Sequence, residues 1–182
     1  CDKTLPGRLM ALVPPTAPSV FAFGGSMLPG HEPDGTENTV LSAIEGVGRY
    51  QRGAITLQQL DCIERTSAMT VGSCPGQFTA NTMAMVGETL GFSFLGSATL
   101  PAVYSERLAL ARRAGRRGMQ MVKDGGPLPR DLITRKSLEN VCATVAATGG
   151  STNAALHIPA IAHEAGMTPE EFRSRVQAWL EK

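Results

Sequence analysis

The stretch that decides the fold is Gly72-Ser73-Cys74-Pro75-Gly76-Gln77-Phe78-Thr79-Ala80-Asn81-Thr82-Met83. A cysteine lies in a turn between glycines, and small polar residues follow it. The apolar residues Met83, Val86 and Leu90 then recur at helical spacing, which predicts a loop that opens onto the N-terminus of a helix. Free N–H groups and the helix dipole favour an anion there, so we expect the Cys74 thiolate to be stabilised. Such a thiolate suits metal ligation or nucleophilic attack; the alternative is a small buried residue in a turn.

The composition is that of a globular protein with one core. Of the 182 residues, 42% are hydrophobic and 18% are charged, and the formal net charge is +1. This balance gives no indication of binding to nucleic acid or to a membrane surface. No apolar run is long enough to span a bilayer, and no signal peptide is visible. The chain begins with Cys inside a motif, so we interpret it as a piece of a longer protein.

The four cysteines, Cys1, Cys62, Cys74 and Cys142, lie far apart in the sequence. No Cys-x-x-Cys pair is present, which argues against a zinc knuckle, and a chain of this length without a secretion signal does not suggest a disulfide framework. We therefore expect a cytoplasmic protein. Cys62 and Cys142 fall on predicted helices, where we interpret them as packing residues.

Hydrophobic periodicity predicts a mostly helical chain. The short apolar run Ser19–Phe23 is the best strand candidate, and further strands could lie in 69–71 and 92–95. Together these features predict an α/β fold with helix-rich layers around a small mixed or parallel sheet. Helices are predicted near residues 5–12, 40–53, 56–63, 83–90, 104–117, 138–145 and 151–161, and from Thr168 onward.

Three of these helices carry more specific expectations. In the 104–117 helix we expect Leu108, Ala111 and Ala114 to face inward and the arginines to form a solvated face. Pro159 should kink or divide the helix that follows Ser151. The segment from Thr168 to Glu171 is a capping box, and the apolar stripe of the helix that follows comprises Phe172, Val176, Trp179 and Leu180.

Two further stretches could take part in chemistry. Cys1-Asp2-Lys3 places a thiol, a carboxylate and an amine in three consecutive residues, although Asp2 could be a cap and Lys3 could be solvated. Gly149-Gly150-Ser151-Thr152-Asn153 precedes a predicted helix and could cradle an oxyanion or carboxylate. The same residues would equally make a good N-cap.

The three stretches, in this order and spacing, resemble the dihydroxy-acid dehydratase and phosphogluconate dehydratase family of iron–sulfur hydro-lyases. The resemblance extends over essentially all 182 residues. It implies a single partial domain, residues 1–182, that belongs to the N-terminal domain of a two-domain dehydratase. It also implies a homodimer when the protein is full length.

The resemblance implies a role for four residues. Cys1 and Cys74 match two cysteines that hold the iron–sulfur cluster, and a two-iron cluster is favoured over a four-iron one. Asp2 matches a carboxylate ligand of the divalent ion, usually Mg²⁺. Lys3 matches a lysine that is carbamylated in several members and ligates that ion, so it is the candidate catalytic residue. The ligand preferences of the metals agree with these roles, because thiolates suit iron–sulfur clusters and oxygen ligands suit Mg²⁺.

The implied reaction is removal of water from a 2,3-dihydroxy acid to give a 2-keto acid. The expected substrate is the branched-chain dihydroxy acid, and a sugar acid is the alternative. A different class of function is a non-catalytic metal- or thiol-binding module. Another cluster cysteine, another acidic ligand and the expected serine base fall outside these residues in the family, so we expect this piece alone to be inactive.

Overall fold

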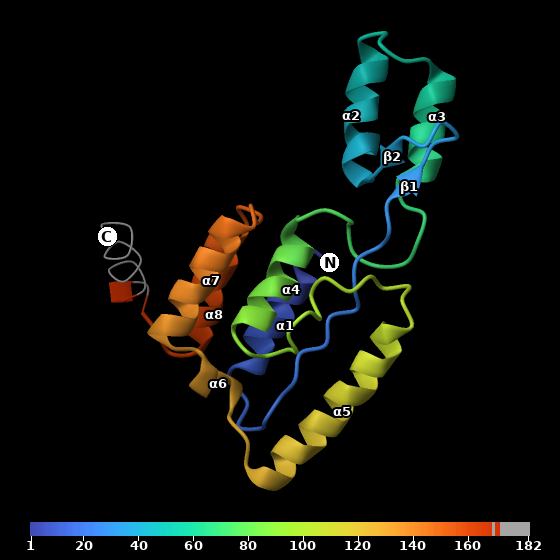
Figure 1. Ribbon diagram of the computed structural model, residues 1–182. Coiled ribbons are helices and arrows are strands. Elements are labelled where there is room, and N and C mark those ends of the chain that lie inside the picture. Colours follow the sequence, from blue (N-terminus) through green and yellow to red (C-terminus); the bar gives the residue numbers. More distant parts are fainter. Residues whose placement is uncertain (169, 172–182) are drawn as a thin grey trace.

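The computed structural model describes residues 1–168 and 170–171. Within them the chain is mostly helical, with one small ribbon of two strands (Figure 1). The helices are α1 (Thr4–Leu12), α2 (Val40–Gln51), α3 (Leu57–Thr66), α4 (Thr79–Thr89), α5 (Glu106–Asp124), α6 (Pro129–Leu132), α7 (Arg135–Ala147) and α8 (Ala154–Glu164). The strands are β1 (Gly30–His31) and β2 (Glu37–Asn38).

The main hydrophobic core lies where α1, α4, α7 and α8 meet (Figure 1). The apolar series predicted for α4 is confirmed, since Met83, Val86 and Leu90 are all buried. Leu9 of α1 and Ile161 of α8 are fully buried against them. Burial of each such side chain stabilises the fold by about 1.5–3 kcal/mol. The core therefore fixes the start of α4, and with it the cysteine loop that precedes this helix.

The helices α2 and α3 and the β1–β2 ribbon form an arm that projects from the rest of the chain (Figure 1). The arm has its own small apolar cluster of Ile55, Leu60 and Ile63. The two helices pack closely because Gly46 has no side chain; a Cβ there would lie 3.1 Å from Leu60 Cδ1. The opposite face of α2 is open, and Ile44 is 71% exposed.

The predicted helix-rich α/β class is confirmed, but the strands differ from the prediction. In the part of the chain that the structure describes, the ladder is antiparallel and pairs Gly30 with Asn38. Ser19–Phe23 is extended but belongs to no ladder, and segments 69–71 and 92–95 are also not strands. The Phe21 N–H donates to Phe92 O at 2.7 Å, and both aromatic rings are buried. The apolar character of 19–23 therefore reflects burial without a neighbouring strand.

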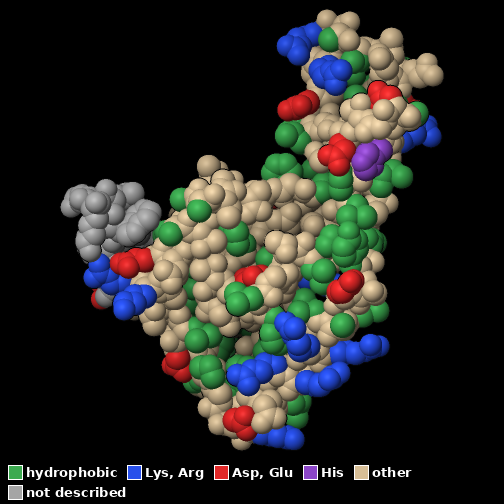
Figure 2. All heavy atoms as spheres, viewed as in Figure 1, with side chains coloured by type: hydrophobic (Ala, Val, Ile, Leu, Met, Phe, Trp, Pro, Cys, Tyr) green, Lys and Arg blue, Asp and Glu red, His purple; other side chains and the backbone are tan. Residues whose placement is uncertain are grey.

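Helix α5 begins near its predicted start but extends seven residues beyond Arg117, to Asp124. Its inward face was predicted wrongly: Ala114 is buried, whereas Leu108 is 66% exposed and Ala111 is also exposed. The expected solvated basic face is confirmed, and Lys and Arg side chains line the surface along α5 in Figure 2. The hydrophobic periodicity did not predict the buried face, because α5 buries only a narrow stripe of side chains.

Arg107 is an exception to the solvated face. Its guanidinium donates to Phe23 O at 2.8 Å, to Ser97 O at 3.1 Å and to Leu100 O. Arg107 is thus a structural tie between α5 and the extended chain.

The remaining helices follow the sequence closely. The capping boxes at Thr39, Thr56 and Thr134 are present. Helix α8 continues through Pro159, so the proline does not divide it. The capping box of Thr168 and Glu171 is confirmed by reciprocal hydrogen bonds, but Phe172, Val176, Trp179 and Leu180 lie outside the described residues. None of the described helices is both long and apolar enough to cross a membrane.

Candidate functional site

The cysteine loop is fastened to the first turns of α4 by one asparagine. The Asn81 amide nitrogen donates to Cys74 O at 3.0 Å and to Gly76 O at 2.6 Å. Its carbonyl oxygen accepts from Ser73 Oγ at 3.1 Å. Cys74 is half-buried and is not part of a disulfide. No side chain caps the N-terminus of α4, so its first N–H groups are not occupied by a capping side chain.

Two close backbone approaches hold the loop from the other side. Ser73 N–H donates to Gly25 O at 3.0 Å, and Met27 N–H donates to Ser73 O at 2.8 Å. Gly72 has φ of 129°, and a Cβ there would lie 2.3 Å from Met27 N. Glycine is therefore required at position 72, because the backbone there has a positive φ and because residues 26–27 approach it closely.

The N-terminal triplet lies at the start of α1. Lys3 Nζ pairs with Asp2 Oδ2 at 2.9 Å, and both side chains are more than half exposed. Hydrogen bonding with Thr79, and then with Lys3, lowers the pKa of Asp2 to about 2. Asp2 is therefore an ionised carboxylate at neutral pH, which is the form that binds a hard cation.

A chain of hydrogen bonds joins the three stretches that were singled out in the sequence. The Asn153 amide nitrogen donates to Asp2 Oδ1 at 3.1 Å and to Thr79 Oγ1 at 2.7 Å. Thr79 Oγ1 also lies 3.2 Å from Ser151 Oγ. The Ser151 N–H donates to Thr82 Oγ1 at 3.0 Å. Residues 1–3, the start of α4 and the start of α8 thus form one polar junction.

A hollow of about 410 Å³ lies beside this junction. Cys1 and Leu5 line it together with Phe23 and Val71, and the backbone of Gly72 and Ser73 completes its wall. Cys1 and the residues immediately before Cys74 therefore face the same space. The hollow and the polar junction together make the candidate site.

His157 lies one turn along α8 from Asn153, and no role was predicted for it. Its Nε2 is buried and has no hydrogen-bond partner among the described residues. Burial lowers the pKa of His157, and the positive charge of Lys3 lowers it further. Both effects favour the neutral imidazole, and the charge of Asp2 opposes them.

The donor atoms at the site have the chemistry that the sequence resemblance implies. Cys1 and Cys74 are free thiols, as an iron–sulfur cluster requires, and Asp2 supplies oxygen atoms for a divalent cation. The described residues hold no group of three or more His, Cys, Asp or Glu side chains placed to bind a metal. The donor atoms of Cys1, Cys74 and Asp2 are therefore of the kinds that the implied cluster and cation need, and they would make up part of each ligand set.

The other two cysteines lie elsewhere. Cys142 packs against the main core from α7, and burial raises its pKa. Cys62 is half-buried on α3 in the arm, and desolvation followed by the charge of Glu32 raises its pKa. The position of Cys142 agrees with the packing role predicted for it, whereas the same role for Cys62 stays a prediction.

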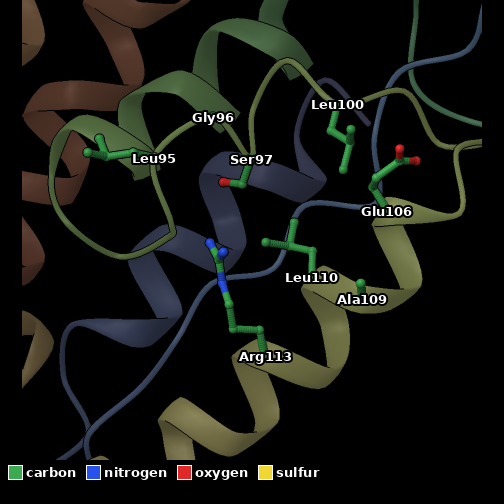
Figure 3. A pocket seen from close by; sticks show the side chains of 8 residues that line it. All are labelled: Leu95, Gly96, Ser97, Leu100, Glu106, Ala109, Leu110 and Arg113. Carbon is green, nitrogen blue, oxygen red and sulfur yellow. The ribbon is translucent and has the colours of Figure 1, made fainter.

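A second hollow of about 330 Å³ lies under α5, away from these motifs. Figure 3 shows that Leu110 and Arg113 project from α5 toward the loop of Leu95, Gly96 and Ser97. The Arg113 guanidinium lies 4.0 Å from the centre of the Phe94 ring. None of Cys1, Asp2, Lys3 and Cys74 lines this hollow, so it does not mark the candidate site.

The chain is similar to curated proteins named as dehydratases. It is 64% identical over 167 residues to "Dihydroxy-acid dehydratase 2" of Bordetella bronchiseptica, covering 92% of this chain and 29% of that protein. It is 56% identical over 167 residues to "Dihydroxy-acid dehydratase 3" of Bradyrhizobium diazoefficiens, covering 92% and 28%. A "Dihydroxy-acid dehydratase" of Natronomonas pharaonis is 48% identical, again covering 92% and 28%. The chain thus spans less than a third of the length of these relatives.

The family model for the N-terminal part of dihydroxy-acid/6-phosphogluconate dehydratases matches residues 1–178. This match includes all three stretches that meet at the polar junction. The chain belongs to the dihydroxy-acid/6-phosphogluconate dehydratase family.

Proposed function

We propose that these residues form part of the active site of a hydro-lyase that converts a 2,3-dihydroxy acid to a 2-keto acid. The observation that carries the proposal is the junction of Asp2, Thr79 and Asn153 beside the Cys74 loop. In a chain of this family, the junction joins the segment of Cys1 and Asp2 to the helix that follows the Cys74 loop. We further propose that residues 1–182 are one part of the N-terminal domain of a two-domain enzyme.

Four residues would hold the metal groups. Cys1 and Cys74 would each bind an iron of the cluster, for which we favour the two-iron form, and Asp2 and Lys3 would ligate Mg²⁺. When bound, the two groups would supply Lewis acidity at the departing hydroxyl and at the substrate carboxylate. The low pKa of Asp2 keeps this ligand ionised through the physiological range. Lys3 would contribute oxygen ligation after its amine, once deprotonated, is converted by CO₂ to a carbamate with release of a proton.

The chain's own residues would organise this chemistry. Asn81 holds the Cys74 carbonyl, so the thiol stays at a fixed place before α4. Leu5 and Phe23 give the hollow beside Cys1 an apolar wall. Positioning of this kind is what lets an active site act on a substrate without first rearranging.

We propose a branched-chain 2,3-dihydroxy acid as the substrate; the names of the relatives support a dihydroxy acid. A sugar acid is the second candidate, because the family also includes 6-phosphogluconate dehydratases. We also propose a cytoplasmic homodimer. The exposed stripe of Leu41, Ile44 and Val47 on α2 offers apolar surface for a contact between copies, and a mass measurement in solution tests this.

The proposal is tested with the polypeptide as the gene encodes it, purified without oxygen. Iron, sulfide and visible absorption are recorded, together with formation of 2-keto acid from 2,3-dihydroxy-isovalerate and from a panel of sugar acids. We expect a cluster, with two irons per chain, and turnover of the branched-chain acid. Turnover of a sugar acid alone would select the second candidate. A cluster without turnover of any acid would instead favour a metal- or thiol-binding module.

A further inference from the structure

Asn153 occupies the N-cap position of α8 but does not cap the helix. Asparagine is preferred at this position because its side-chain oxygen normally accepts a backbone N–H of the first turn. Here no such side-chain bond is present. The amide nitrogen instead donates to Asp2 Oδ1 and to Thr79 Oγ1. The side chain thus serves contacts outside its own helix.

The two partners of Asn153 differ in how firmly they are held. Thr79 is the first residue of α4 and is 6% exposed, so the main core fixes its position. The Asp2 side chain is 53% exposed. Asn153 therefore connects an exposed carboxylate to a buried residue at the start of α4.

Asn153 is itself oriented by its neighbours. Its backbone N–H donates to Ser151 Oγ at 3.2 Å, and this hydroxyl also lies 3.2 Å from Thr79 Oγ1. The Ser151 N–H is bound by the fully buried Thr82. The Ser151 and Thr82 hydroxyl groups thus hold the backbone that carries the Asn153 amide.

We propose that Asn153 is a positioning residue for Asp2, which holds one carboxylate oxygen so that Asp2 is preorganised to bind a divalent cation. The proposal rests on the proposed function for the presence of that cation. A partner that orients a metal-binding carboxylate typically changes metal affinity by about 10–100-fold when it is removed. Asn153 itself need not touch the metal or the substrate.

The test measures Mn²⁺ binding by electron paramagnetic resonance in the polypeptide as the gene encodes it. Asn153→Ala should weaken Mn²⁺ binding by about tenfold or more. Iron content should stay at the wild-type level, because Cys1 and Cys74 are unchanged. Asn140→Ala, at an exposed position on α7, is the matched control and should bind Mn²⁺ normally.

A second variant separates the contact with Asp2 from the start of the helix. Asn153→Ser keeps a residue that is favoured at the N-cap, so α8 can still begin there, but its hydroxyl is too short to reach both partners. It should weaken Mn²⁺ binding as Asn153→Ala does, while the thermal unfolding midpoint stays near that of wild type.

The decisive comparison is made in an Asp2→Asn background. If Asn153 acts through Asp2, Asn153→Ala should cause no further loss of Mn²⁺ affinity there. An equal further loss, or unchanged affinity in Asn153→Ala and Asn153→Ser, would overturn the proposal. A wild-type protein that binds no Mn²⁺ would overturn it together with the assignment of Asp2 as a ligand. Turnover of dihydroxy acids is assayed separately. If the wild-type protein turns over no dihydroxy acid but Asn153 still affects Mn²⁺ affinity through Asp2, only the proposed function is rejected.

Discussion

At the scale of single residues, the Cys74 loop depends on groups that carry no reactive chemistry. Asn81 binds the carbonyls of Cys74 and Gly76, and Gly72 allows the loop to pass close to residues 26–27. Substitution of Asn81 or Gly72 would keep the cysteine in the sequence but would loosen or displace its backbone. The geometry of the thiol is therefore set by its neighbours in sequence and in space.

Gly72→Ala should destabilise the protein by about 2 kcal/mol or more, because it combines an unfavourable φ with a backbone clash. Gly48→Ala is the matched control, since a Cβ in that part of α2 meets nothing within 4 Å. There alanine should be neutral or stabilise by up to about 1 kcal/mol. Urea unfolding of both variants measures the difference, and equal stabilities would contradict the observed close approach.

The thiols should differ in their dependence on pH. Burial raises the pKa of Cys142, so its thiolate fraction at pH 8 is smaller than that of an unburied thiol, and Cys1 is the exposed thiol for comparison. In the metal-free protein, iodoacetamide should label Cys1 first, and labelling of Cys142 should rise only as the pH increases above the usual range for thiols. Mass spectrometry of the labelled peptides follows both sites. Equal rates at pH 8 would show that Cys142 is not packed as described.

At the scale of elements, the helices with caps and clear apolar spacing could be predicted from sequence. The spacing of Met83, Val86 and Leu90 predicted α4, and the Thr-x-x-Gln pattern at Thr56 predicted α3. The strand predicted at 19–23 was wrong, because an apolar run reports burial and does not reveal whether a neighbouring strand exists. Arg107 was also missed, since nothing in the sequence distinguishes it from the solvated arginines of α5.

The arm should open more readily than the main core. Its buried cluster comprises only Ile55, Leu60 and Ile63, whereas α4 is buried among three other helices. Local stability follows the number of buried apolar groups, so amides of α2 and α3 should exchange with solvent sooner than those of α4. Native-state hydrogen exchange followed by mass spectrometry measures this. Equal protection of α3 and α4 would contradict an independently weak arm.

At the scale of the whole molecule, the candidate site is made by long-range contacts. The sequence pointed to Cys1, Asp2, Lys3 and Cys74 and to the stretch from Gly149 to Asn153, but spacing alone could not show that Asn153 reaches Asp2. These two residues are 151 positions apart, and only the packing of α1, α4 and α8 brings them together. The roles of the four metal-binding candidates remain predictions, and the position of each is consistent with its proposed role.

The central claim is that Cys74 binds a cluster on which dehydration depends. The most direct measurement compares Cys74→Ala with Cys142→Ala in the polypeptide as the gene encodes it, purified without oxygen, by iron content and by 2-keto acid formation. We expect Cys74→Ala to lose iron and turnover together, and Cys142→Ala, which alters a packing residue, to keep its iron and most of its activity. Full iron content and turnover in Cys74→Ala would contradict the account.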